Sequence, residues 1–575
     1  MIEEFKSEEI SFPFKEIKND IEMRDFLLSQ TEEFKFLSIH FKADIDLHSV
    51  LSKYPIEGIS LLKKPEQEGK PNILKQLNPS LNISYIQFNK KVSFIGCEFH
   101  IPVEISKVDF QLGLDIRHSN FHKNLEIFDT VSRGHSTLGL KSGGSLIIMR
   151  SLFEKINDFY SGVEIENLFH IEGTVIKSGL NLSRSKIKGQ LNINNSKLQG
   201  SLIICGASIG ALNLGHRTKN LEVNMDIQGL DISDAEFLGQ VQVYNVNING
   251  VLNAHRATFN ELSFFTKVNF FDNVYFSEAA FHKSMHLEFS SAKKIFSFSN
   301  STINSQMYFH EIDLSCANVY FTGTQINANL WLGNLLHKEP VIFNGKLSFQ
   351  GASISSTSIV RLFNINNKKS LVGELDFSNS LIKGFLDIRN VYVREVSFDG
   401  ALVLGNIQDN NTLLRAIKDR NTARVLKHEA KRINNTISSL NYNKMEMKLH
   451  SKTLELRSFS DWSILRLNYI SNNYGADWIW GSLFTITMGL VFYSIFNMCV
   501  YGFGVPWNDH FNFLLNDKDF WIGFINYFWL PTGFGELTKN DELAGGWGGA
   551  ISFILGKILI AYGIYQTIAA FRKYI

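Results

Sequence analysis

The 575-residue sequence predicts a mainly β fold, a β-solenoid with about 22 residues in each coil, followed by helices. Three observations predict it. Apolar residues recur in steps of five and six over about residues 81–405, this pattern stops abruptly after Val403, and two long apolar stretches follow near the C-terminus. A chain of this length exceeds one ordinary globular core, so a repeat array or several domains are expected. The predicted parts are an N-terminal mixed helical cap (1–75), the solenoid (76–405), a basic helical linker (406–475) and a membrane module (476–575).

Composition narrows the function classes. The formal net charge of +1 gives no reason to invoke nucleic acid, and 48 Phe with only 9 Pro fit a regular strand-rich array. Four cysteines lie far apart, which predicts neither disulfides nor a zinc site but buried thiols in a reducing compartment: Cys97, Cys205, Cys316 and Cys499. The polar, acidic start MIEEFKSEEI is unlike a secretory signal, so the bulk of the protein is expected in the cytoplasm.

The first 75 residues lack the repeat. Residues 14–30 have the spacing of an amphipathic helix, and residues 63–72 (KKPEQEGKPN) are typical of an exposed loop. Because open solenoid ends expose strand edges, this region is expected to cap the first coil.

The repeat has a period of eleven, made of alternating steps of six and five. Its apolar anchors are Phe88, Phe94, Phe99, Ile105, Phe110, Ile116, Phe121 and Ile127, then Leu182, Ile187, Ile193, Leu198, Ile204 and Ile209, and later Phe377, Ile382, Ile388, Val393, Phe398 and Val403. Pairs two residues apart place both side chains on one face of a short strand. A turn after every five or six residues then makes four faces per coil, and coils stack at about 4.8 Å.

Interior positions alternate in size. The residues two before successive anchors are large at Leu180, Leu191 and Leu202, and small at Ser185, Ser196 and Ala207. Four inward side chains sharing a narrow lumen explain the alternation. Four glycines precede the strands that carry the large positions, namely Gly179, Gly189, Gly200 and Gly210. A corner is expected there, and a corner needs the permissive backbone of glycine.

This periodicity resembles the pentapeptide-repeat family, which implies a right-handed quadrilateral β-helix. The resemblance covers about residues 81–405, with irregular stretches near 130–170 and 333–345, and with Phe and Ile in place of the family's preferred Leu. It implies about fifteen coils in a rod roughly 70 Å long. Leucine-rich or other α/β repeats would need periods of about 20 to 29 with helical segments, which the sequence lacks.

The linker after Val403 has helical spacing and is basic. Between residues 411 and 471 it carries twelve basic and five acidic residues. A basic segment beside a membrane span is what anionic headgroups and the positive-inside bias favour, while a solvated helical hairpin is the alternative.

Two transmembrane spans are predicted, at about 478–504 and 546–571. The first has no charge over 27 residues, and the second is followed by Arg572 and Lys573. The basic flanks predict a multi-pass protein of the inner (cytoplasmic) membrane, with the solenoid and the C-terminus in the cytoplasm.

A re-entrant loop is predicted between the spans, at about 519–537. Its apolar run from Phe520 to Pro531 is too short to cross a bilayer. The glycines at alternate positions that follow could turn carbonyl groups toward an ion. This order resembles the two-helix potassium-channel pore, and the filter-like residues are Pro531, Thr532, Gly533, Phe534, Gly535 and Glu536.

The resemblance has departures. Pro531 stands where that filter has Thr, and Lys557 lies near the middle of the second span, where it is expected to govern pore charge or gating, to snorkel, or to pair with the linker. Acidic residues outnumber basic ones between the spans, which favours cations over anions at the mouth, although a solvated loop is the alternative. They are Asp509, Asp517, Asp519, Glu536, Asp541 and Glu542 against Lys518 and Lys539.

Small residues form a stripe on the second span at Gly548, Ser552 and Gly556. Such stripes let helices approach closely, either within one chain or between copies.

The linker and membrane module together are similar to a recurrent bacterial arrangement. It combines a pentapeptide array with an S-x-x-Y-G box, here Ser471–Gly475, two spans and a terminal run like IYQTIAAFRKY. The resemblance implies a membrane protein of ion-channel type.

No nucleotide, hydrolase or metalloprotease motif occurs, so an enzyme, a cofactor and a metal site are not expected. His118 and His122 are interpreted as surface or stacking residues. The leading hypothesis is an oligomeric ion channel, tetrameric if channel-like, with lipid and inorganic ions as partners and the solenoid as sensor or gating domain. A non-conducting membrane-anchored scaffold and a membrane-disrupting effector in bacterial defence are the alternatives.

Overall fold

The computed structural model describes residues 15–571 except 18–19, 31–33, 38, 42–44, 58, 62–79, 159–161, 216–224, 316, 334–339, 367–370, 411, 454–458, 502–517 and 539–545. The chain forms two compact units, Met1–Val396 with Gly400–Thr412, and Ser397–Asp399 with Leu413–Ile575. The predicted loop at 63–72, Cys316, and most charged residues between the spans lie outside the described residues.

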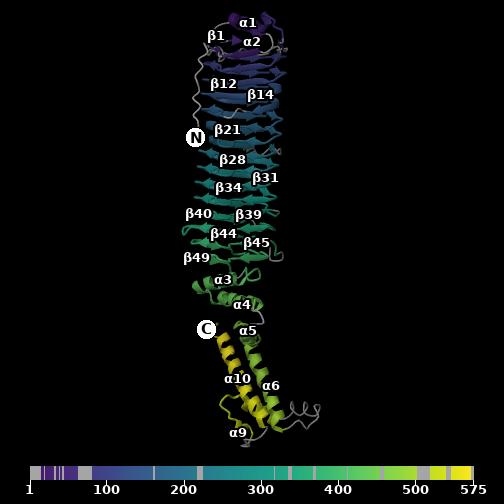
Figure 1. Ribbon diagram of the computed structural model, residues 1–575, viewed down its shortest axis with the longest axis vertical. Helices are drawn as coiled ribbons and strands as arrows, with labels where there is room; N and C mark the ends of the chain where they lie inside the picture. The colour runs from purple at the N-terminus through teal and green to yellow at the C-terminus, as the bar shows by residue number, and fades with distance from the viewer. Residues whose placement is uncertain are drawn as a thin grey trace, which may run out of the picture. The chain divides into compact units, whose positions relative to one another are not determined.

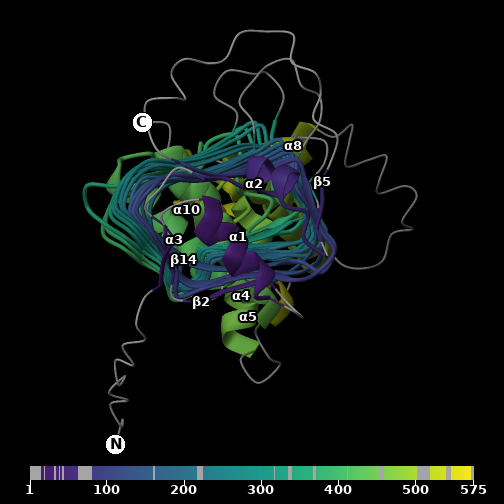
Figure 2. The same ribbon diagram turned by 90° about the horizontal axis from the view of Figure 1, so that it is seen from above.

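The first unit is a parallel β-solenoid of about 14 turns with about 22 residues per turn (Figure 1). This confirms the predicted fold class. One face is a ten-stranded parallel sheet, made of β20 (Leu180–Asn181), β23 (Leu202–Ile203), β26 (Leu230–Asp231), β29 (Leu252–Asn253), β32 (Val274–Tyr275), β36 (Ile295–Ser297), β39 (Asn318–Tyr320), β42 (Lys346–Ser348), β45 (Glu374–Asp376) and β48 (Glu395–Ser397). Viewed along the stack, successive turns superimpose (Figure 2).

The other faces belong to one larger sheet, whose strands also pair in parallel from turn to turn, except that β5 (Ile59–Leu61) pairs antiparallel with β7. Its N-terminal members are β6 (Leu81–Ser84), β7 (Ile86–Phe88), β8 (Val92–Ile95), β9 (Glu98–Phe99), β10 (Val103–Ser106), β11 (Asp109–Phe110), β12 (Leu114–Phe121), β13 (Leu125–Phe128), β14 (Val131–Ser142), β15 (Leu146–Met149) and β16 (Leu152–Asp158). Its longest later strands are β18 (Leu168–Glu172), β21 (Lys186–Asn194), β24 (Ser208–Gly215), β28 (Val241–Ile248), β31 (Ser263–Phe270) and β44 (Ile359–Phe363).

The predicted anchors fill the interior. From Phe88 to Ile127 each is at most 3 % exposed, and those from Leu182 to Ile209 are at most 1 % exposed. The large and small positions, such as Leu191 and Ser196, are likewise buried. Only the last anchor, Val403, is half-exposed.

A column of phenylalanines runs through the interior of the later turns. Successive rings stack at 5.2, 5.0, 4.9 and 4.9 Å between centroids, all within 7° of parallel, in the order Phe276, Phe298, Phe321, Phe349 and Phe377. The column continues past the irregular stretch near 333–345. Extra residues there are therefore accommodated without interrupting the core.

The glycines predicted at the corners have another role. Positive φ falls instead on Gly173, Arg184, Asn195 and Gly206. At Gly189 an added Cβ would lie 1.5 Å from the Asn167 carbonyl oxygen of the neighbouring turn. The prediction of a permissive backbone was therefore wrong at the predicted corner glycines, Gly179, Gly189, Gly200 and Gly210. Glycine is required there because the neighbouring turn approaches too closely to leave room for a side chain.

The N-terminal region extends the ladder. It contains β1 (Lys15–Ile17), α1 (Asp20–Leu28), β2 (Phe34–Leu37), β3 (Ile39–Phe41), β4 (Ile45–Asp46), α2 (Leu47–Lys53) and β5 (Ile59–Leu61). Strands β2, β3 and β4 pair in parallel with β8, β9 and β6, so the edges of the first turn are covered. The predicted helix at 14–30 is shorter, since Lys15–Ile17 are a strand.

The second unit is helical. It comprises α3 (Arg420–Arg432), α4 (Thr436–Thr453), α5 (Phe459–Asn472), α6 (Trp478–Tyr501), α8 (Lys518–Phe528), α9 (Phe534–Leu537) and α10 (Gly546–Phe571). Helices α3 and α4 pack together as a hairpin. Two helices are long and apolar enough to span a membrane, over Trp478–Val500 and Gly546–Phe571, where the sequence predicts spans.

Candidate functional site: the membrane module

The two long helices pack along their length through small residues. An added Cβ at Gly481 would lie 2.9 Å from Thr567 Oγ1, and one at Gly563 would lie 2.3 Å from Thr485 Oγ1. Close helix contact through small residues is typical of transmembrane pairs.

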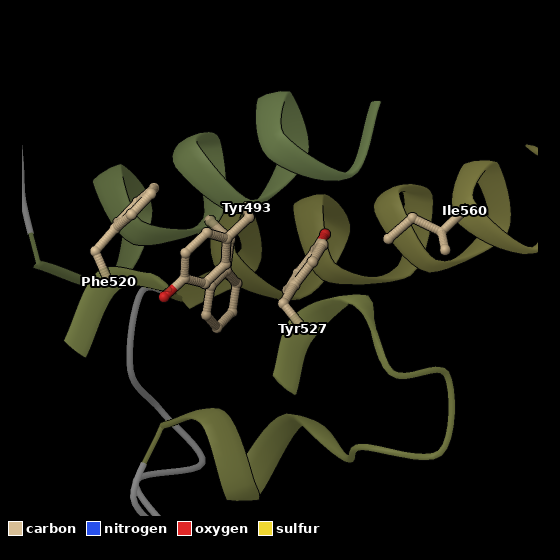
Figure 3. Packing of buried hydrophobic residues seen from close by; sticks show 5 residues of the cluster. Tyr493, Phe520, Tyr527 and Ile560 are labelled. Carbon is tan, nitrogen blue, oxygen red and sulfur yellow. The ribbon is translucent and has the colours of Figure 1, made fainter. Parts of the chain in front are cut away.

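Helix α8 occupies the predicted re-entrant segment. Its eleven residues make about 16 Å of helix, roughly half the thickness of a hydrocarbon core. The helix is held by a buried cluster contributed by α6, α8 and α10, comprising Tyr493, Phe496, Phe520, Tyr527 and Ile560 (Figure 3). A half-helix is thus fixed between two helices of spanning length.

Tyr527 is the centre of this cluster. Its side chain is fully buried, and its hydroxyl donates to the Ser552 carbonyl oxygen at 3.0 Å. An added Cβ at Gly556 would lie 1.9 Å from Tyr527 Oη and 2.8 Å from Phe492 Cβ. Gly556 therefore makes room for α8.

The small-residue stripe is used within the chain. Ser552 and Gly556 are buried against Tyr527, and an added Cβ at Gly548 would lie 3.2 Å from Cys499 Sγ on α6. Within one chain the stripe packs against α6 and α8, and its use between copies stays a prediction.

Lys557 contacts the C-terminal end of α8. Its Nζ donates to the Trp529 carbonyl oxygen at 2.5 Å, and it lies 5.6 Å and 5.4 Å from the ring centroids of Tyr527 and Phe553. The last carbonyls of a helix have no helical partner and carry the negative end of its dipole. A cation placed there is stabilised by both the hydrogen bond and the ring faces.

The filter-like residues follow directly. Thr532 N–H also donates to the Trp529 carbonyl, at 3.2 Å. Gly533 is extended (φ −79°, ψ 161°), and Phe534–Leu537 form the short helix α9, in which the Phe534 carbonyl accepts from Thr538 N–H. Pro531, Gly533 and Glu536 are exposed, and Thr532 and Gly535 are half-exposed. The assignment of these residues to an ion filter stays a prediction.

The S-x-x-Y-G box ends α5 and joins it to α10. Asn473, Tyr474 and Gly475 all have positive φ, and Gly475 N–H donates to Asn472 Oδ1 at 2.6 Å. The buried Asn472 amide donates to the Gln566 carbonyl at 3.4 Å and also contacts its side-chain oxygen.

A second amide, Asn468, extends this network. Its Oδ1 accepts from Tyr562 Oη at 3.2 Å and from Gln566 Nε2 at 3.1 Å. Sequence reasoning missed these partners, although polar residues in an apolar span were a usable signal. The box therefore connects the linker to the second span.

The basic linker is organised around one buried carboxylate. Glu446 on α4 is 3 % exposed and pairs with Arg424 (3.2 Å), Arg420 (3.8 Å) and Lys427 of α3. Burial raises the pKa of Glu446, but the hydrogen bonds and charges of Lys427 and Arg424 outweigh it, so the net shift is downward. Three of the linker's cations thus pair with an internal acid.

Cysteine and histidine predictions have mixed outcomes. Cys97 is buried, whereas Cys205 and Cys499 are half-exposed. His118 is exposed, and His122 stacks on His100, as the surface or stacking interpretation expects.

Comparisons with family models, with curated proteins and with solved structures gave no match to this chain.

Proposed function

We propose that this protein is a membrane-anchored β-solenoid whose helical unit forms an oligomeric, ion-conducting pore. In this proposal the solenoid lies in the cytoplasm of a bacterial cell, at its inner membrane, and acts as a sensor or gating domain. Two spans and one half-helix cannot enclose a channel alone, so several copies are required, four if the assembly is channel-like.

The observation that carries the proposal is the half-helix α8 fixed between α6 and α10. A short apolar helix followed by irregular backbone is tolerated at membrane depth where protein shields it or where it lines water. The buried hydroxyl of Tyr527 and the contact between Lys557 and Trp529 hold the end of α8, and the exposed residues Pro531 and Gly533 follow.

Each residue then has a role. Thr532 to Gly535 set permeation, and Glu536 attracts cations to the mouth. Lys557 positions the end of α8, and through it the filter-like segment. Its charge is already partnered by a carbonyl, which supports a positioning role over that of a free cation in the pore.

Ion flux through purified full-length protein in liposomes tests the proposal, with K⁺, Na⁺ and Cl⁻ gradients compared. Gly533 suits this test because an added Cβ meets nothing within 4 Å, so Gly533→Ala is expected to fold and conduct. Gly533→Asp places a carboxylate in the proposed path and is expected to alter or abolish flux. Lys557→Met removes the cation that holds α8, and flux is expected to fall, with Lys557→Arg retaining more of it.

Absence of flux under every gradient would refute a pore. Equal flux through Gly533→Asp, Lys557→Met and wild type would refute the roles given to these two residues. Toxicity on expression in cells, abolished by Gly533→Asp, would point to a membrane-disrupting effector that uses the same pore.

A non-conducting scaffold is the second candidate, and a specific contact favours it. Phe534, within the filter-like segment, is helical and packs against Phe496 and Phe553 of its own chain, with ring centroids 5.9 and 5.5 Å away. In that function Gly533 only starts a turn. A monomeric or dimeric mass in detergent together with absent flux would support it.

A further inference from the structure

We propose that the N-terminal turns of the solenoid carry a binding site for a divalent transition metal ion, formed by Glu98, His100 and His122. Nothing in the pore proposal uses these residues, and the two proposals are independent.

The three side chains converge across two adjacent turns. His122 Nε2 lies 2.7 Å from Glu98 Oε2, and the rings of His100 and His122 stack with centroids 4.4 Å apart and 7° between their planes. One potential ligand atom from each residue lies within 4.8 Å of the other two. Two imidazoles and one carboxylate form a donor set that suits zinc and its neighbours in the first transition row.

The solenoid core fixes this arrangement. Strand β9 pairs with β12 in a register that places Phe99 opposite Phe121, and these rings stack inside at 4.4 Å. The backbone continues the register, because His122 N–H donates to the Phe99 carbonyl at 2.9 Å. The residues that follow, His100 and His122, are therefore held side by side on the outer surface.

The site is open to solvent on the side of the next turn. The residue after Ser142, which pairs with Phe121, is Gly143, and its N–H donates to the Phe121 carbonyl at 2.8 Å. A glycine at this ladder position places no side chain over His122. Both histidines are exposed, so an ion can enter and keep a coordination position for water.

Coordination requires a small adjustment. Nitrogen and oxygen ligands lie about 2.0–2.2 Å from zinc, so ligand atoms within 4.8 Å must draw closer by side-chain rotation. Such a rotation leaves the strands in place, because the stacked rings of Phe99 and Phe121 fix the backbone of both turns at this position. Bound metal would then join two consecutive turns.

The test is a calorimetric titration of the EDTA-treated full-length protein in detergent with Zn²⁺ at pH 7.5. Wild type is expected to bind one equivalent that His122→Ala and His100→Ala lose or weaken at least about tenfold. Glu98→Gln keeps the size of the side chain but removes its charge, and an intermediate loss is expected.

His255→Ala is the matched control. His255 Nε2 lies 3.9 Å from Glu278 Oε2 on a neighbouring turn. Among the described residues, this His–Glu pair belongs to no cluster of three potential metal ligands. The His255→Ala variant is expected to bind one equivalent of Zn²⁺ with the affinity of wild type. Far-UV circular dichroism should show that every variant keeps the strand content of wild type. The proposal is overturned if His122→Ala binds Zn²⁺ as tightly as wild type. It is also overturned if wild type binds Zn²⁺ no more tightly than the double variant His100→Ala/His122→Ala.

Discussion

Replacing Gly556 with Ala should loosen helix α8 from helix α10. The added Cβ would lie 1.9 Å from Tyr527 Oη, 2.8 Å from Phe492 Cβ and 2.9 Å from Tyr527 Cζ. The Tyr527 ring is fully buried and its hydroxyl is bonded to Ser552, so it cannot move aside without breaking a contact. Overpacking of this kind costs about 1–3 kcal/mol, and the better helix propensity of Ala offsets up to about 1 kcal/mol. A net loss of about 1–2 kcal/mol is expected.

Intrinsic tryptophan fluorescence during thermal unfolding in detergent measures this loss, because seven of the eight tryptophans lie at or after Trp462. For a unit of this size, the loss corresponds to a fall in Tm of about 2–8 °C. The double variant Gly556→Ala/Tyr527→Phe removes the closest atom, the Tyr527 hydroxyl oxygen, and should recover part of the loss. Its loss of stability is therefore expected to be smaller than the sum of the losses in the two single variants.

Gly548→Ala is the control, since its Cβ would meet only Cys499 Sγ, at 3.2 Å. Its Tm should stay within about 3 °C of wild type, which corresponds to under about 1 kcal/mol. If Gly556→Ala is as stable as Gly548→Ala, Tyr527 is not packed against the second span, and the half-helix arrangement is refuted.

Two further predictions concern the linker and the solenoid. Because the pKa of Glu446 is lowered in the folded chain from its ordinary 4.5, its contribution to stability is present above that value and is lost as pH falls through the folded pKa. Urea unfolding followed at 222 nm should therefore show a smaller acid-induced loss of stability in Glu446→Gln than in wild type, with the variant less stable at pH 7. Equal pH profiles would contradict the stabilisation of this carboxylate by Lys427 and Arg424. In the solenoid, Gly189→Ala drives a Cβ against the Asn167 carbonyl of the adjacent turn and should cost about 3 kcal/mol in urea unfolding. Gly229→Ala, whose nearest contacts are 3.0 Å and 3.3 Å, should cost far less, and similar midpoints for the two variants would show that turn spacing does not exclude a side chain at Gly189.

The repeat could be predicted because a solenoid relates distant residues by a constant interval. Anchors such as Phe99 and Phe121 are buried and stacked one turn apart, and the step of five or six residues already specifies which side chain faces inward. The same interval contained a signal for the proposed metal site. Residues 22 apart are neighbours on the surface, so His100 belongs with His122, whereas His118, four residues before it, does not.

The candidate pore was predictable only in outline. Length and apolar composition locate α6, α8 and α10 within a few residues of the predicted bounds, since the bilayer fixes how long a span must be. Which partner Lys557 takes did not follow from composition. A lysine in an apolar helix needs a polar partner or water for its charge. The sequence alone did not decide whether Lys557 faces a pore, snorkels to the membrane surface or pairs with the linker.

The sequence by itself determined the local geometry of this protein, namely the strand period, the coil length and the helices of spanning length. These depend on side-chain spacing along one segment, and spacing is written directly in the order of residues. The tertiary structure decided the contacts between segments: Tyr527 against Gly556, Lys557 on the Trp529 carbonyl, and Asn472 on Gln566. Those contacts depend on how helices approach and rotate about one another, which many sequences with the same apolar pattern would satisfy differently.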